Sequence, residues 1–594
     1  MCAAGAMTRE TDAAPKALVL QGVTRRFRVS KRVVTALDGV SAWTSPGLVT
    51  GLIGPDGAGK TTLMRLIAGL LRLEEGRIAV FGTDVGAEPL RVQGMISYMP
   101  QRFGLYEDLT VQENLDLYAD LQGVLAADRP ARYAELLHMT GLRPFTSRLA
   151  GRLSGGMKQK LGLACTLIRP PLLLLLDEPT VGVDPVSRRE LWQIVDHLVR
   201  GAGMSVLLST AYLDEAERCD EVLLLHEGQL IGAGKPGDLT GAMKGRSFLA
   251  RAAGTPKRAL QMALAVAPGV TDALIQGEAV RLVLEAGVAP ETVRPPGIDG
   301  LTLAPIAPRF EDRFVDLLQA KTGGRAGGTG SPPTAASGPL EAAIEVEHLT
   351  KRFGAFVAVD DISFTVRRGE IFGLLGANGA GKSTTFRMLC GLLPATSGRL
   401  RVDGFDLRSA AATARARLGY MAQKFSLYGD LSVRQNLRFF AAAYGLRGQR
   451  RRERIDWALG EFELGGYAEA TSRDLPLGFK QRMALACALM HEPDVLFLDE
   501  PTSGVDPLAR REFWRRITAL ADQGVTVLVT THFMDEAEYC DHLVIMAQGR
   551  ILAAGTSEDL KSAARTAERP APTMEDAFVA LIAAAGASRA GQAA

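Results

Sequence analysis

Two short segments of the chain combine glycines, a lysine and a hydroxyl residue at a spacing that suits phosphate binding. Both fit the pattern G-x-x-x-x-G-K-[ST], in which backbone N–H groups curl around phosphate oxygens and the lysine reaches the β- and γ-phosphates. The helix expected after each loop turns its positive N-terminus towards the same anion. The residues predicted to bind the nucleotide are Gly54, Pro55, Asp56, Gly57, Ala58, Gly59, Lys60, Thr61 and Thr62 in the first loop, and Gly376, Ala377, Asn378, Gly379, Ala380, Gly381, Lys382, Ser383 and Thr384 in the second.

A pair of adjacent acids ends a second apolar run in each half of the chain. Asp177 and Glu178 follow one run, and Asp499 and Glu500 follow the other, each pair 117 residues after its lysine. The aspartate suits Mg²⁺ binding through water, and the glutamate suits polarisation of the water that attacks the γ-phosphate. The hydroxyl of the loop is a second Mg²⁺ ligand. The sequence therefore predicts ATP hydrolysis with ATP and Mg²⁺ bound, Glu178 and Glu500 as catalytic residues, and Thr61, Asp177, Ser383 and Asp499 as metal ligands.

These motifs belong to a duplicated domain. The stretch MPQRFGLYEDLTVQENL from Met99 returns as MAQKFSLYGDLSVRQNL from Met421, and Lys60 and Lys382 lie 322 residues apart. A period this long indicates a repeated domain, because solenoid repeats recur every 20 to 50 residues or so. Each half alternates apolar runs with helical patterns, which is typical of parallel α/β sheets. The dense apolar run before each glycine-rich loop predicts a central strand buried on both faces.

The remaining segments set the expected domain boundaries. We expect a first nucleotide-binding domain over 17–245, a small appended α/β subdomain over 246–321, a flexible linker over 322–342, a second nucleotide-binding domain over 343–563, and a C-terminal helix and tail over 564–594. The linker is rich in Gly, Ser and Pro and cannot bury apolar area. The 17 residues from Thr322 to Gly338 span roughly 20 to 25 Å, enough to let the two halves face each other.

Composition excludes several other classes of protein. Lys and Arg total 68 against 66 for Asp and Glu, so the net charge of +2 gives no electrostatic case for nucleic acid. The six cysteines form no metal-binding spacing and are expected to be buried thiols. No run of 18 apolar residues occurs, and Met1–Glu10 lacks the pattern of a secretory signal. We expect a cytoplasmic protein without a spanning segment of its own.

A further motif, LSGGMKQK at Leu153–Lys160, precedes the first Asp-Glu strand. With the loops and the acids, it makes the chain resemble the ATP-binding cassette (ABC) family over roughly residues 17–240 and 343–560. The resemblance implies an α/β fold of two P-loop cassettes in tandem, each with a mostly parallel sheet core and with antiparallel β and helical subdomains. It also implies that the cassettes pair within the chain, and that the LSGGM signature of one closes over the ATP held by the other.

The same resemblance assigns further residues. Ser154, Gly155 and Gly156 would contact the γ-phosphate. The Q-loop residues Gln101 and Gln423 would sense Mg²⁺ and the membrane partner, and Asp184 and Asp506 would end the D-loops. Phe27 and Phe353 stand where family members stack a ring on adenine, although an aromatic near a strand end is as often a core residue.

The two halves differ at two motifs. The second signature reads LPLGFKQ, so Pro476 stands where Ser154 stands and Leu477 where Gly155 stands. The hydroxyl and an N–H donor are lost, and bulk is added where a phosphate must approach. The switch histidine of the family, a third catalytic candidate, is present as His532 but is replaced by Ala211 in the first half. Crossed pairing would place both defects at the Lys60 site. We therefore predict hydrolysis at the Lys382 site and a degenerate site at Lys60.

By resemblance, the chain is the ATPase subunit of an ABC transporter that exports drugs or other amphiphilic compounds. The predicted partners are separately encoded integral membrane channel subunits, with a periplasmic adaptor as a further candidate, and the predicted location is the inner face of the cell membrane. The stretches FGLYEDLTVQENL and FSLYGDLSVRQNL would dock those subunits, with Phe103 and Phe425 either as contacts or, equally, as core residues. Two alternatives stay open. One is an importer ATPase, and the other is a soluble tandem cassette protein acting on ribosomes or DNA.

Overall fold

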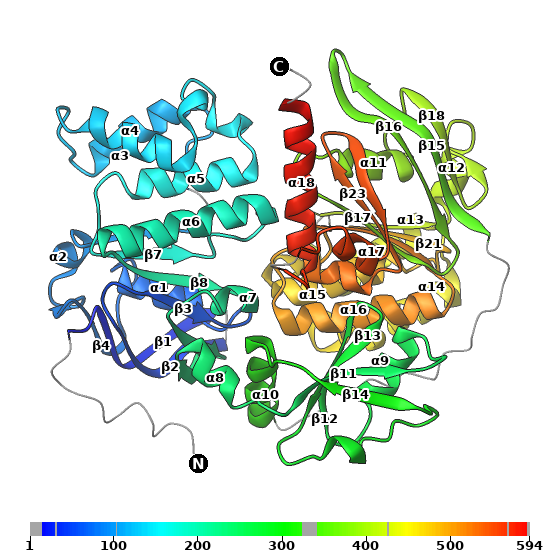
Figure 1. Cartoon of the computed structure of the whole chain (residues 1–594), viewed down its shortest axis with the longest axis horizontal. Helices are drawn as coiled ribbons and strands as arrows, with labels where there is room; N and C mark the ends of the chain where they lie inside the picture. Colours follow the sequence, from blue (N-terminus) through cyan, green and yellow to red (C-terminus); the bar gives the residue numbers. More distant parts are fainter. Residues whose placement is uncertain are drawn as a thin grey trace. The chain divides into compact units, whose positions relative to one another are not determined.

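The computed structural model describes residues 15–29, 32–101, 104–322, 341–423, 427–566 and 569–590. It divides into two compact units, 1–244 with 307–322 and 245–306 with 323–594, and each is described by itself (Figure 1). Residues 323–340 of the predicted linker lie outside the described residues, as do the candidate docking residues Phe103 and Phe425.

The centre of the first unit is a six-stranded sheet in the order β10-β9-β3-β8-β7-β6. Its strands are parallel except that β10 runs antiparallel to β9. All five residues of β3 and of β7 are buried, which explains why both runs are apolar rather than alternating. The bounds are β3 (Val49–Ile53), β6 (Ile96–Met99), β7 (Leu173–Asp177), β8 (Ser205–Thr210), β9 (Glu221–His226) and β10 (Gln229–Gly234).

An antiparallel sheet and a set of helices complete this unit. The sheet has the order β2-β1-β4-β5 and packs with α1 around one apolar core that includes Leu18, Leu52 and Leu66. The strands are β1 (Leu18–Val29), β2 (Arg32–Thr44), β4 (Glu75–Val80) and β5 (Thr83–Asp84). The helices are α1 (Lys60–Ile67), α2 (Pro89–Gln93), α3 (Val111–Leu121), α4 (Arg129–Thr140), α5 (Gly155–Thr166), α6 (Pro185–Ala202), α7 (Leu213–Ala216), α8 (Pro236–Gly241) and α10 (Phe310–Thr322).

The second unit repeats this plan. Its six-stranded sheet has the order β20-β21-β22-β17-β23-β24, and its antiparallel sheet has the order β16-β15-β18-β19. The strands are β15 (Ala342–Phe353), β16 (Phe356–Arg367), β17 (Ile371–Gly376), β18 (Ser397–Val402), β19 (Phe405–Asp406), β20 (Leu418–Met421), β21 (Val495–Asp499), β22 (Thr526–Thr531), β23 (His542–Ala547) and β24 (Arg550–Gly555). The helices are α11 (Lys382–Leu389), α12 (Ala411–Arg415), α13 (Val433–Ala443), α14 (Gly448–Glu461), α15 (Leu477–Ala488), α16 (Pro507–Asp522), η6 (Met534–Tyr539), α17 (Ser557–Ser562) and α18 (Met574–Ala590).

The second unit also contains a small sheet that lies between the two cassettes in the sequence. It has the order β12-β13-β11-β14, all antiparallel, with α9 packed on β12 and a separate apolar core. Its elements are β11 (Ser247–Ala252), α9 (Lys257–Ala265), β12 (Val270–Gln276), β13 (Ala279–Leu284) and β14 (Leu301–Pro305). The following helix, α10, instead packs on α7 and α8 of the first unit.

Polar contacts fix this small sheet to the second cassette. The Arg258 guanidinium pairs with Asp541 and lies 3.5 Å from an Asp522 carboxylate oxygen. Arg511 at the start of α16 pairs with Asp272 on β12. The backbone N–H of Gly277, in the turn between β12 and β13, donates to the Glu538 carboxylate at 2.7 Å. Glu538 and Asp541 lie in the segment that follows His532, and Arg511 and Asp522 lie on α16.

Within the described part of the chain, none of the helices combines the length and the apolar character that a membrane crossing requires.

Candidate active sites

The glycine-rich loop of the first cassette joins β3 to α1. A Cβ at Gly54 would lie 2.2 Å from the Leu225 carbonyl oxygen, so only glycine lets the two backbones approach this closely. Gly59 has φ 103° and is the N-cap residue of α1, a left-handed conformation that glycine adopts without strain. The Lys60 amine donates to the carbonyl oxygens of Gly54 at 2.8 Å and Pro55 at 3.1 Å. The loop therefore curls around the lysine amine and points it along the inside of the turn.

The Asp-Glu pair of the first cassette meets this loop at the carboxyl end of β7. Asp177 accepts hydrogen bonds from the hydroxyls of Thr61 at 3.2 Å, Ser209 at 2.7 Å and Tyr98 at 3.1 Å. Burial is the main cause that raises the pKa of Tyr98 to about 12, so this phenol stays a donor to the carboxylate. A hydroxyl and a carboxylate held together in this way form an oxygen donor set that fits Mg²⁺.

Glu178 is the residue that contacts both the loop and the Q-loop. Its carboxylate lies 3.1 Å from the Lys60 amine and accepts from the Gln101 amide at 2.6 Å. Its φ is 51°, a left-handed value that is uncommon for a residue with a side chain. Glu500 repeats it with φ 46°. Backbone strain repeated at both acids is typical of side chains that must be aimed at a reacting group.

The second cassette repeats most of this arrangement. The Lys382 amine donates to the carbonyl oxygens of Gly376 at 2.6 Å and Ala377 at 3.1 Å. Asp499 accepts from the Thr530 hydroxyl at 2.6 Å. Burial raises the pKa of Asp499 above its ordinary value, against the Thr530 hydrogen bond that lowers it. Ser383, the candidate metal ligand of this loop, is exposed at the start of α11.

The two cassettes differ beside the glutamate that is predicted to be catalytic. In the second cassette, Glu500 accepts from the Gln423 amide at 2.7 Å and lies 3.3 Å from Nδ1 of His532. His532 is buried, and its Nε2 has no hydrogen-bond partner among the described residues. Such an orphaned donor or acceptor usually marks a position that a ligand or water satisfies. In the first cassette, Ala211 is buried at the corresponding position and offers no polar side chain.

This histidine affects the ionisation of the glutamate. Burial acts to raise the pKa of Glu500, but the hydrogen bond and charge of His532 outweigh it, together with Lys382 and Gln423. The pKa of Glu500 therefore lies below its ordinary value, and the carboxylate is ionised at neutral pH. An ionised carboxylate is the form that can accept a proton from an attacking water.

The two signature segments differ at the residue that caps the helix after them, as their sequences predict. Ser154 is the N-cap of α5, and its hydroxyl accepts from the Met157 N–H at 3.3 Å. A Cβ at Gly156 would lie 2.4 Å from the Ser187 hydroxyl, so this position needs glycine for close packing on α6. In the second cassette, Pro476 is the N-cap of α15 and provides no side-chain cap. The first turn of α15 thus lacks the acceptor that α5 has.

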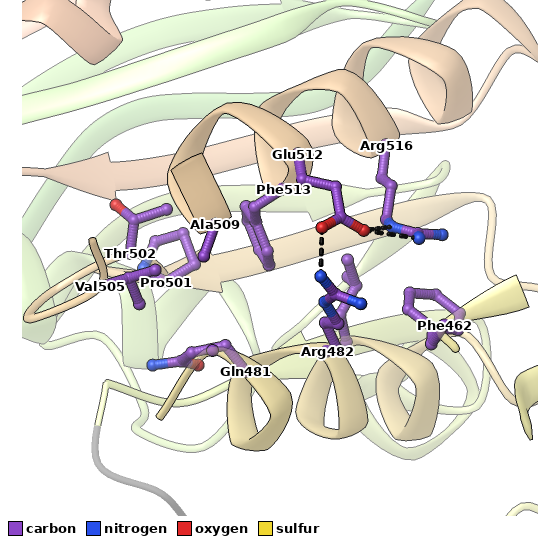
Figure 2. A pocket seen from close by; sticks show the side chains of 12 residues that line it. Phe462, Gln481, Arg482, Pro501, Thr502, Val505, Ala509, Glu512, Phe513 and Arg516 are labelled. Carbon is purple, nitrogen blue, oxygen red and sulfur yellow. Dashed lines mark hydrogen bonds and ion pairs between the residues drawn. The ribbon is translucent and has the colours of Figure 1, made fainter. Parts of the chain in front are cut away.

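A partly buried ion network joins the second signature helix, α15, to α16 (Figure 2). Glu512 lies between the guanidinium groups of Arg482 and Arg516, pairing with the first and accepting from the second at 2.7 Å. The side chains of Phe462, Val505 and Phe513 line the small cavity beside this network. The network therefore ties the middle of α15 to α16.

The remaining predicted residues are Asp184, Asp506 and the candidate adenine-stacking residues Phe27 and Phe353. Asp184 is the N-cap of α6 and accepts from the Ser187 N–H at 3.1 Å, and Asp506 accepts from the Ala509 N–H at 3.1 Å. The candidate adenine platforms each carry a cation over the ring. Arg25 lies 5.0 Å from the Phe27 ring centroid, and Lys351 lies 5.1 Å from that of Phe353.

Sequence reasoning missed the residues that hold the two aspartates predicted to bind Mg²⁺. Ser209 and Thr530 donate to Asp177 and Asp499, and their hydroxyls also accept from the backbone N–H of the glutamates, at 3.0 and 2.9 Å. The repeat contained this signal, because both residues end apolar strands and stand two residues before Ala211 and His532.

The chain is similar to known proteins over both cassettes. Residues 37–181 and 359–503 each match the model of the family described as ABC transporter. The chain is 54% identical over 572 residues, 95% of its length and 97% of the relative's, to the "Probable multidrug ABC transporter ATP-binding protein YbhF" of Escherichia coli. It is 42% identical over 222 residues, 37% of its length and 73% of the relative's, to the Nod factor export ATP-binding protein I of Cupriavidus metallidurans. A solved structure of an ATP-binding subunit of an ABC transporter is 32% identical to this chain, with a TM-score of 0.37. The match covers 40% of this chain and 99% of the chain in that structure.

The fold and the paired loop and acid motifs define an ATP-hydrolysing enzyme with two P-loop cassettes. The chain belongs to the ABC transporter family, as an ATP-binding subunit that carries both cassettes in one polypeptide. The predicted family, fold class, ATPase activity and ATP binding are therefore confirmed.

Proposed function

We propose that this subunit drives an exporter of drugs or other amphiphilic compounds through separately encoded membrane subunits, from the inner face of the cell membrane. Relatives named as a multidrug transporter subunit and as a Nod factor export subunit support the direction and the kind of cargo. The stretches that follow Gln101 and Gln423 are the surfaces where the membrane subunits dock. ATP hydrolysis at the cassettes is transmitted through them.

We infer that the two ATP sites are unequal. The observation that carries this proposal is the pairing of His532 with Glu500 at 3.3 Å, where the first cassette has Ala211. In the crossed pairing that we propose, the signature of each cassette completes the site of the other. The Lys382 site then receives Ser154, and the Lys60 site receives Pro476, which gives α15 no side-chain cap. Hydrolysis is fast at the Lys382 site, and the Lys60 site binds ATP and turns it over slowly.

The residues of the Lys382 site divide the chemistry among them. The lysine amine and the loop N–H groups neutralise the phosphates, and Glu500 accepts the proton of the attacking water. His532 keeps this carboxylate ionised and turns its free nitrogen to the γ-phosphate. Mg²⁺, held by Ser383, Asp499 and Gln423, would supply charge neutralisation at the β- and γ-phosphate oxygens. Thr61, Asp177 and Gln101 form the matching set of the first cassette.

The transport proposal is tested with the membrane proteins that co-purify with the full-length chain. Inside-out vesicles containing them should accumulate ethidium when ATP is added, since export from the cell is import into such vesicles. Accumulation should disappear with Lys382→Ala and fall less with Lys60→Ala. Absence of ATP-driven accumulation for a panel of amphiphilic cations, or ATPase stimulation by RNA or DNA in its place, would contradict the proposal.

A further inference from the structure

The two proposed docking surfaces have opposite charge. We call residues 106–128 the acidic docking face and the corresponding residues 428–450 the basic docking face. The acidic docking face has six acidic and no basic residues, a net charge of −6. The basic docking face has four arginines and one aspartate, a net charge of +3. Two surfaces at the same position of a duplicated domain thus differ by nine charges.

The fold beneath these charges is the same. Helices α3 and α13 each begin with a capping box, formed by Thr110 with Glu113 and by Ser432 with Gln435. A buried asparagine in each helix donates to the carbonyl of an upstream tyrosine, at 3.1 Å in the first cassette and 3.0 Å in the second. The capping boxes and the asparagine contacts therefore form with either set of charges.

The acidic docking face is only partly neutralised within its own unit. Glu107 pairs with Lys158 at 2.7 Å, and Asp120 pairs with Arg129 at 2.7 Å. Asp108 and Asp116 form no ion pair with any residue of the described chain. Negative charge is therefore left over for a partner.

The basic docking face mirrors this arrangement. Arg434 pairs with Glu469 at 2.7 Å, and Arg450 pairs with Glu492 at 2.8 Å. Arg438, which occupies the position of Asp116, and Arg447 have no carboxylate partner among the residues that the structure describes. Positive charge is therefore left over on this face.

Apolar side chains stand beside the unpaired charges on both faces. Tyr106 is 57% exposed and its counterpart Tyr428 is 49% exposed. Leu121 is 70% exposed on the acidic docking face, and Phe439 is 44% exposed on the basic one. Phe439 contacts Tyr428 edge to face with ring centroids 4.7 Å apart. An exposed aromatic anchor rimmed by charges is typical of a protein interface.

We propose that the acidic docking face binds a cationic segment of a membrane subunit and the basic docking face binds an anionic segment, so the two segments are not interchangeable. The inference rests on the proposed function and specifies its partners. Charge complementarity selects partners mainly by penalising the wrong one, because like charges placed together across an interface cost several kcal/mol. A pair of identical membrane segments would meet one favourable and one unfavourable face.

A lipid surface explains these features less well. Anionic lipid headgroups would attract the basic docking face but would be repelled by the acidic one. Protein segments of opposite charge account for both faces at the same position in each cassette.

The test exchanges single charges between equivalent positions. Asp116→Arg installs the residue that α13 carries at this position, and Arg438→Asp installs the residue of α3, so each substitution matches the sister cassette. Asp116→Arg also removes the carboxylate that accepts from the Gln112 amide at 3.2 Å, so the folding check is essential. Two amphipathic helical peptides serve as probes. Both have the same apolar face of Leu and Tyr, and the polar face carries only Lys in one peptide and only Glu in the other. Circular dichroism and melting of each full-length variant check that it folds.

Asp116→Arg should weaken binding of the Lys peptide roughly tenfold and leave that of the Glu peptide unchanged, and Arg438→Asp should do the reverse. Both effects should fade at high salt. Equal effects on both peptides, or none, would overturn the charge proposal. Arg438-dependent binding to phosphatidylglycerol vesicles without binding of the Glu peptide would identify a lipid occupant and overturn it as well.

A binding assay with membranes stripped of peripheral proteins by alkaline carbonate distinguishes failure of the charge proposal from failure of the proposed transporter function. Failure of the unmodified chain to bind them would count against the transporter assignment of the docking faces. Binding by the unmodified chain that both charge variants match would count against the charge inference alone.

Discussion

Removal of Arg258 should loosen the small sheet from the second cassette. This guanidinium is 12% exposed and lies between two carboxylates, pairing with Asp541 and lying 3.5 Å from Asp522. Burial raises the pKa of Asp522, and the charge of Arg258 opposes that rise. Arg258→Ala would therefore leave two partly buried carboxylates beside each other without their cation.

The expected loss of stability lies between two reference values. An exposed ion pair contributes about 0.2–1 kcal/mol, whereas removing one partner of a fully buried pair costs about 3–5 kcal/mol. Arg258 is nearly buried, but its partners are 31% and 16% exposed. We expect a loss of about 2 kcal/mol from the second unit.

Thermal unfolding and hydrogen exchange measure this effect. The melting midpoint of the second unit should fall by several degrees, and amide exchange should rise over Met534–Asp541, the segment that the small sheet contacts. Arg251→Ala is the matched control, because Arg251 is an exposed arginine on the same small sheet. If the two variants have the same melting midpoint and the same amide exchange rates, the small sheet does not stabilise Met534–Asp541 through Arg258.

Two further predictions concern the active sites. His532→Ala removes interactions that lower the pKa of Glu500 and leaves the burial that raises it, so the acidic limb of the residual ATPase pH profile should move to higher pH. An unchanged acidic limb would contradict this role. Gly156→Ala places a Cβ 2.4 Å from the Ser187 hydroxyl and should cost about 1–3 kcal/mol of stability, measured by urea unfolding. Adding Ser187→Ala should restore only part of that loss, because the Cβ of residue 187 would still lie 2.7 Å from the new Cβ, and no restoration would place the strain elsewhere.

The sequence was most informative where chemistry constrains local spacing. The loops at Lys60 and Lys382 need glycine because a Cβ at Gly54 or Gly376 would clash with a neighbouring backbone carbonyl. The sequence shows this requirement as a motif. The Leu-rich β7 is buried on both faces of its sheet, so its composition alone indicated a central strand. Duplication strengthened both inferences, since chance does not repeat a motif and its strand at the same offset.

Long-range partners were not readable in the same way. Arg258 and Asp541 are 283 residues apart, and neither residue carries a local signal for the other. Periodicity indicates that a residue faces a core or solvent, but it does not say which distant surface the residue meets. The association of the small sheet with the second cassette, and of α10 with the first, therefore required the structure.

The backbone conformation of the two glutamates could not be predicted from the sequence either. The left-handed φ values of Glu178 and Glu500 run against the preference of a side-chain-bearing residue, so no propensity predicts them. They arise where β7 and β21 end and the chain must turn while the carboxylate stays aimed at the loop.

The proposed inequality of the two ATP sites is tested most directly by replacing the candidate catalytic glutamates one at a time. The full-length chain with its membrane partners is assayed for steady-state ATP turnover as Glu500→Gln and as Glu178→Gln. We predict a loss of about 100-fold or more for Glu500→Gln and retention of most of the activity for Glu178→Gln. Equal losses in the two variants would contradict the unequal sites.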